Sequence, residues 1–172
     1  MTLDRLNTLS PRDAVTLFRR CCGSLRWAQS MQERRPFTGV GQLHTVAKAV
    51  WNGMTPDEWR EAFAQHPRIG DIKSLRKKFS TASDWAKGEQ AEASGASERV
   101  LKSLYESNNL YEAKFGYIFI VSATGKSAEE MLAILNRRLN NAPSEEIKIA
   151  AQEHAKITRL RLEKLLASDT SS

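Results

Sequence analysis

Residues 10–22 read SPRDAVTLFRRCC, a helix start followed by an amphipathic helix pattern. Ser10 is a hydroxyl cap, Pro11 stands at the first helical position and Asp13 is an acid at the third. Apolar residues then recur at three- and four-residue intervals, at Ala14, Leu17, Phe18 and Cys21. The stretch predicts an amphipathic helix that packs on a shared core.

The same signals recur along the chain. Thr55-Pro56-Asp57-Glu58 repeats the cap, proline and acid, and Ser127-Ala128-Glu129-Glu130 repeats the cap and acid without proline. Helical spacing of apolar residues continues through 39–51, 59–65, 101–115 and 144–166. We therefore expect an all-α, single-domain bundle over residues 1–172, with about eight or nine helices and a frayed tail at 168–172.

One segment breaks the helical pattern. Tyr117-Ile118-Phe119-Ile120-Val121 is a continuous run of β-branched and aromatic residues that follows Gly116. An isolated extended segment has no sheet to satisfy its backbone, so its N–H and C=O groups must meet side chains, water or a ligand. We expect a buried extended segment at about 117–123 that lines a pocket; an irregular start to a buried helix fits the periodicity as well.

Composition and charge place the chain among ordinary folded proteins. Hydrophobic residues make up 41% and charged residues 27%, and the net charge is +6. The basic residues are scattered and carry no interleaved aromatic residues, which favours solvated helix faces over a nucleic-acid surface. The longest apolar stretch, Tyr117 to Ala123, is far short of the ~20 residues that cross a bilayer, and the N-terminus is charged. We expect a cytoplasmic protein without membrane or nucleic-acid partners.

Neither a metal site nor a phosphate loop is indicated. Cys21 and Cys22 are adjacent in a predicted helix, so we expect reduced packing residues, and His44 has no ligand partner one turn away. Gly125-Lys126-Ser127 resembles the end of a phosphate-binding loop, but Ile120 stands where its first glycine belongs.

The stretch 65–71, QHPRIGD, is the most informative for function. His66 lies at the end of a predicted helix, and Pro67 disfavours helical geometry there, so the imidazole is presented at a helix end. A lone histidine is commonly structural, but the loop placement, the fixed backbone and the nearby charges support a functional role equally well. Glu89 and Gln90 read alone as a solvated turn, and Arg161 near the end of the last helix as a surface cation.

Taken together and in order, these motifs resemble the 2-oxo-4-hydroxy-4-carboxy-5-ureidoimidazoline (OHCU) decarboxylase family, which acts in the breakdown of urate to allantoin. The resemblance runs almost end to end. It rests on Leu6-Asn7, Trp27-Ala28, Arg35-Pro36-Phe37, His66-Pro67-Arg68-Ile69-Gly70, Glu89-Gln90, Asn108, Tyr111, Phe115-Gly116, Phe119-Ile120, Thr124-Gly125, Arg138-Leu139, Lys156-Ile157 and Arg161-Leu162.

The resemblance implies a role for each matching residue. His66 would be the catalytic histidine and Glu89 its acidic partner, with Arg161 binding substrate oxygens. The other implied substrate-binding residues are Pro67, Gln90, Phe119, Ile120 and Val121. The chain departs from the common family form at Tyr117 and Ile118, where phenylalanine and proline are frequent.

The resemblance further implies a decarboxylase for a small anionic substrate that forms S-allantoin, as a homodimer, without a cofactor or metal. The alternative is a basic helical module in which the charge of +6 recruits nucleic acid or an acidic protein and His66 belongs to the core.

Overall fold

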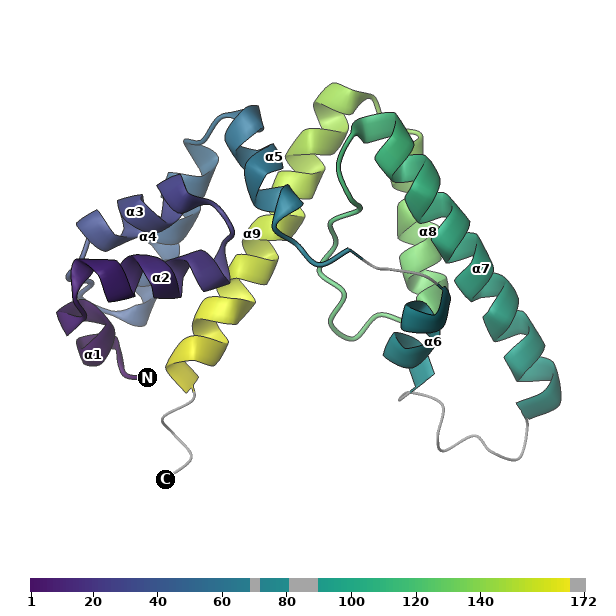
Figure 1. Ribbon diagram of the computed structural model, residues 1–172, viewed down its shortest axis with the longest axis horizontal. Helices are drawn as coiled ribbons and strands as arrows, with labels where there is room; N and C mark the ends of the chain where they lie inside the picture. Colours follow the sequence, from purple (N-terminus) through teal and green to yellow (C-terminus); the bar gives the residue numbers. More distant parts are fainter. Residues whose placement is uncertain (69–71, 81–89, 168–172) are drawn as a thin grey trace. The chain divides into compact units, whose positions relative to one another are not determined.

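The computed structural model describes residues 1–68, 72–80 and 90–167, with the backbone alone at 80 and 90–97 (Figure 1). Nine α-helices and no strand occur in these described residues, which confirms the all-α prediction. None of the described helices is long and apolar enough to span a membrane. The chain forms two compact units, Met1–His66 with Ile149–Ser172 and Pro67–Lys148. A single domain stays a prediction, since two compact units can fold as one.

The first unit contains five helices from the N-terminal part of the chain and most of the last helix. Their bounds are α1 Leu3–Thr8, α2 Pro11–Cys21, α3 Leu25–Glu33, α4 Val40–Asn52, α5 Pro56–Ala64 and α9 Pro143–Ala167. The predicted caps are confirmed: the side chain of Ser10 accepts from the N–H of Asp13, and Thr55 forms a reciprocal capping box with Glu58.

The core of the first unit is built on aromatic side chains. Phe18 meets Trp27 edge to face at 5.9 Å and Phe37 at 6.3 Å. Cys21 and Cys22 are free thiols buried beside this cluster, as expected of packing residues, and burial raises their pKa values to about 11 and about 12. These thiols are therefore unreactive at neutral pH.

The second unit contains three helices and the first residues of α9. Their bounds are α6 Ile72–Ser80, α7 Gln90–Phe115 and α8 Ala128–Leu139. Figure 1 shows α7 and α8 running side by side, and the contacts between them are extensive. The side chain of Ser127 caps α8 by accepting from the N–H of Glu130, as its sequence predicts.

Residues 118–123 of the second unit form neither helix nor strand, and Phe119, Ile120 and Val121 are buried there. This confirms the prediction of a buried non-helical segment. The guanidinium of Arg138 donates to the carbonyl of Ile120 at 2.6 Å, and the ammonium of Lys126 donates to that of Ser122 at 2.6 Å. Side chains thus supply part of the backbone hydrogen bonding that no sheet provides.

A buried ionic network anchors this segment. Arg138 pairs with Glu146 at 2.6 Å, and both side chains are at least nine-tenths buried. The hydroxyl of Tyr111 donates to Glu146 at 2.5 Å, and Asn141 donates to its other carboxylate oxygen at 3.0 Å. Burial of the Tyr111 ring and the carboxylate of Glu146 beside it raise the pKa of the phenol. Because each charge is hydrogen-bonded, the network is compatible with its buried position.

Candidate active site

His66 lies one residue beyond the C-cap of α5, in a fixed backbone position. Its N–H donates to the carbonyl of Phe63 at 3.1 Å, and Pro67 follows directly. Gly23 packs closely against Gln65, the residue before His66. A Cβ at position 23 would lie 2.4 Å from the Cβ of Gln65. A side chain at position 23 would therefore displace the helix end that carries His66. No local pattern in the sequence indicates this role of Gly23, because Gln65 is distant from it in the chain.

The imidazole of His66 packs against a second histidine. The rings of His66 and His154 meet edge to face at 4.9 Å, and His154 stacks on Trp51 at 4.5 Å with an interplanar angle of 12°. Trp51 is itself held because its indole N–H donates to the carbonyl of Ala151 at 2.9 Å. The stack therefore fixes His66 against a rigid aromatic wall.

His154 is completely buried and was not singled out in the sequence. Its Nδ1 lies 3.4 Å from the hydroxyl of Thr158, one turn further along α9. In the part of the chain that the structure describes, Nε2 of both His66 and His154 is buried without a hydrogen-bond partner. The helical spacing of the sequence could have indicated that His154 is buried, because it shares the apolar face of α9 with Ala150 and Leu162.

Both imidazoles are neutral at neutral pH. Burial, with the nearby guanidinium of Arg161, lowers the pKa of His66 to about 4. Burial, with the neighbouring imidazole of His66 and guanidinium of Arg161, lowers the pKa of His154 to about 3. A neutral imidazole can accept a proton, which is the property a general base needs.

Arg161 lies in the same unit and is half-buried. Its guanidinium donates to the carbonyl of Cys21 at 3.4 Å, and no carboxylate of the described residues pairs with it. The neighbouring Arg159 differs, because it is exposed and its Nε donates to Glu163 at 3.0 Å. Arg161 thus offers an uncompensated positive charge near His66, which suits an anionic ligand.

The remaining predicted site residues differ in their burial and in whether the structure describes them. Pro67 is exposed, and Phe119, Ile120 and Val121 are buried in the second unit. Glu89 lies outside the described residues, and Gln90 begins α7 with its side chain undescribed. The structure therefore places the charge of Arg161 near enough to His66 to help lower its pKa, and the roles of all these residues stay predictions.

No group of three His, Cys, Asp or Glu side chains that could hold a metal ion occurs among the described residues.

The sequence profile of the family described as OHCU decarboxylase matches residues 7–163. The chain belongs to the OHCU decarboxylase family. It is 40% identical over 151 residues to the uric acid degradation bifunctional protein TTL of Arabidopsis thaliana, covering 86% of this chain and 45% of that protein. It is 24% identical to the 2-oxo-4-hydroxy-4-carboxy-5-ureidoimidazoline decarboxylase of Haloferax volcanii, covering 98% of each.

A solved OHCU decarboxylase shares the fold. The crystal structure of OHCU decarboxylase in the presence of (S)-allantoin has a TM-score of 0.69 and 36% identity, covering 87% of this chain and 96% of that chain. The chain thus spans nearly all of a solved OHCU decarboxylase but less than half of the bifunctional Arabidopsis protein.

Proposed function

We propose that this protein decarboxylates 2-oxo-4-hydroxy-4-carboxy-5-ureidoimidazoline to S-allantoin in urate degradation, and that it needs no metal or organic cofactor. Membership of the OHCU decarboxylase family supports the reaction. The observation that carries the proposal within the chain is the neutral imidazole of His66, which lies near the charge of Arg161 and has a free Nε2 in the described structure.

The reaction breaks the bond between a ring carbon and its carboxylate. Carbon dioxide leaves, and the electron pair of that bond delocalises into an adjacent carbonyl or imine of the substrate. A proton then adds to the ring carbon, so hydrogen replaces the carboxylate. Delivery of the proton to one face gives a single enantiomer, here S-allantoin.

Each site residue has a part in this chemistry. Arg161 holds an anionic oxygen of the substrate, because its guanidinium lacks a carboxylate partner in the described structure. His66 and Glu89 hydrogen-bond the substrate hydroxyl and ring and transfer the protons. Pro67 and Gln90 lie beside them in sequence, and the backbone of Phe119, Ile120 and Val121 binds the ureido and ring groups.

The state and place of the enzyme complete the proposal. The active form is a homodimer in the cytoplasm, and the substrate is a small anion, with no nucleic acid or membrane as partner. The excess of basic residues that gives the net charge of +6 favours an anionic substrate.

The proposal is tested by measuring the decay of freshly generated substrate. Absorbance gives the rate of decay, and circular dichroism gives the chirality of the product. The wild-type protein should accelerate the decay and give a chiral product. His66→Ala and Glu89→Ala should each lose about 10²-fold or more in turnover, the scale of acid–base groups. Lys102→Ala, an exposed substitution on α7, should keep full turnover and serves as the matched control. Near-normal turnover in both site variants, with unchanged thermal unfolding, would refute the assignment.

A further inference from the structure

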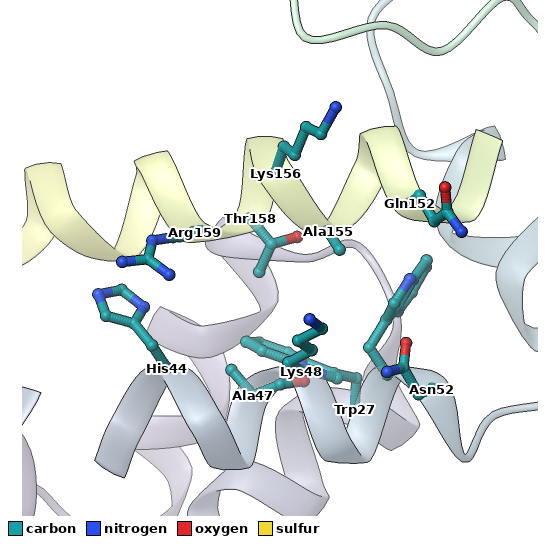
Figure 2. A pocket seen from close by; sticks show the side chains of 11 residues that line it. Trp27, His44, Ala47, Lys48, Asn52, Gln152, Ala155, Lys156, Thr158 and Arg159 are labelled. Carbon is teal, nitrogen blue, oxygen red and sulfur yellow. Dashed lines mark hydrogen bonds between the residues drawn. The ribbon is translucent and has the colours of Figure 1, made fainter. Parts of the chain in front are cut away.

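The first unit contains a cavity of about 350 Å³ between α4 and α9, separate from the site around His66 (Figure 2). Its lining includes neither His66, His154 nor Arg161. A volume of this size lies within the range of small-molecule sites, which starts at roughly 300 Å³.

The middle of the cavity is apolar. Ala47 and Ala155 line it, and Trp27 and Trp51 border it while being only 0% and 3% exposed. The indole N–H of Trp27 donates to the carbonyl of Ala47 at 3.1 Å, and that of Trp51 donates to Ala151 at 2.9 Å. Because both indole N–H groups are already bonded, the middle of the cavity offers an occupant apolar contacts alone, which favours an apolar molecular body.

The two ends of the cavity are polar in different ways. Figure 2 shows His44 of α4 and Arg159 of α9 facing each other at one end, with Asn52 and Gln152 at the other. The first end offers a guanidinium and an imidazole. The second end offers two amides, which can donate to and accept from an uncharged polar group.

The imidazole at the first end has an unused polar atom. The side chain of His44 is only 10% exposed, and its Nδ1 is buried without a hydrogen-bond partner in the part of the chain described. Its Nε2 lies 3.8 Å from Glu163, beyond hydrogen-bond reach. Native proteins usually pair such atoms, so the unsatisfied ring nitrogen of His44 leaves a hydrogen bond for an occupant to make.

The charges that line the cavity are positive. Lys48 has no ion-pair partner among the described residues. Arg159 pairs with Glu163 through its Nε alone. Lys156 pairs with Glu153 at 2.5 Å, and Figure 2 shows its side chain directed away from α4. Among the residues that the structure describes, no Asp or Glu lines the cavity. The free charge of Lys48 and the remaining N–H groups of Arg159 therefore favour an anionic occupant.

We propose that this cavity is a second binding site, which takes a small organic anion with an apolar body. Its carboxylate lies at the end formed by His44 and Arg159, within reach of Lys48. Its apolar body lies against Ala47 and Ala155. A hydroxyl or amide at the far end of the ligand pairs with Asn52 and Gln152.

A suitable probe is 6-hydroxy-2-naphthoate, which has a flat bicyclic body, a carboxylate at one end and a hydroxyl at the other. Isothermal titration calorimetry should show saturable binding with one site per chain. The methyl ester of the same compound keeps the ring and hydroxyl but lacks the charge, and it should bind about tenfold more weakly or worse. In proton–nitrogen correlation spectra, the indole signals of Trp27 and Trp51 should shift on addition of the acid.

Three variants locate the binding. Lys48→Met removes the free charge and keeps most of the aliphatic stem, and Ala155→Leu fills the apolar middle, so each should weaken binding about tenfold. Lys102→Met, on exposed α7 surface of the other unit, is the matched charge control and should bind like wild type. Thermal unfolding of each variant confirms that it is folded.

The proposal is overturned if the acid does not bind, if the ester binds equally well, or if folded Lys48→Met and Ala155→Leu bind like Lys102→Met. None of these measurements involves decarboxylation, so their outcome is independent of the proposed reaction at His66.

Discussion

The imidazole rings of His66 and His154 meet edge to face, with 4.9 Å between their centroids and 84° between their planes. His154 is fully buried and His66 half-buried, and both pKa values lie far below the usual value of 6.5. Because the two rings are in contact, the protonation of His154 should affect both the stability of the first unit and the surroundings of His66, the predicted catalytic base.

Acid should destabilise the protein through His154. Its pKa is lowered to about 3 in the folded state, so between pH 7 and that value the unfolded chain binds the extra proton. Stability is therefore present above the unfolded pKa and is lost as the pH falls. At pH 5 this histidine alone should cost about 2 kcal/mol relative to pH 7. Urea unfolding at both pH values should show a drop in the free energy of unfolding that is smaller by this amount in His154→Gln; equal drops in both proteins would contradict the assignment.

Arg161 and Arg159 form a matched pair of cations on α9. Arg161 lacks a carboxylate partner among the described residues and lies near His66, whereas Arg159 is exposed and pairs with Glu163. Arg161→Met should lower kcat/KM by about 10²–10³, the scale of losing one donor to developing charge. Arg159→Met should leave kcat/KM close to wild type. If the two variants lose activity equally, the charge of Arg161 has no special part in catalysis.

The acid limb of the pH–rate profile should report His66. If the neutral imidazole is the active form, kcat/KM should stay level down to about pH 5 and fall toward the His66 pKa of about 4. The charge of Arg161 contributes to this low value, so the His66 pKa should rise in Arg161→Met. Titration of the imidazole signals by NMR measures that shift in the variant and in Arg159→Met. A His66 pKa near 6.5 in the wild type would refute the prediction.

The buried pair of Arg138 and Glu146 should dominate the stability of the second unit. Arg138→Met leaves an unpaired buried carboxylate and removes the donor to the carbonyl of Ile120, so it should cost about 3–5 kcal/mol. Replacing both residues, as Arg138→Met with Glu146→Leu, should cost less than the sum of the single changes. Arg60→Met, which breaks an exposed pair with Asp57, should cost at most about 1 kcal/mol. Urea unfolding of these variants measures each cost, and additive losses would show that the buried pair is not coupled.

Local sequence signals predicted much of the fold. The caps at Ser10, Thr55 and Ser127 are formed as predicted, because hydroxyl side chains satisfy N–H groups a few residues away. The run at 117–121 was predicted to lie outside the helices because its residue types and flanking glycine are local features.

The parts that escaped prediction depend on residues distant in sequence. His154 stacks on Trp51 and faces His66, and no local pattern specifies which helices bring these rings together. The same holds for the carbonyl of Ile120 and its donor Arg138. Roles for His66, Glu89 and Arg161 came from the resemblance to a family, since each residue by itself has an ordinary structural interpretation.

A crystal structure of this protein with (S)-allantoin tests the central claim most directly. We expect polar atoms of the bound product within about 3.2 Å of Nε2 of His66 and of the guanidinium of Arg161. The carboxylate of Glu89 should contact the same molecule. Product bound beyond hydrogen-bond reach of both His66 and Arg161 would contradict the account.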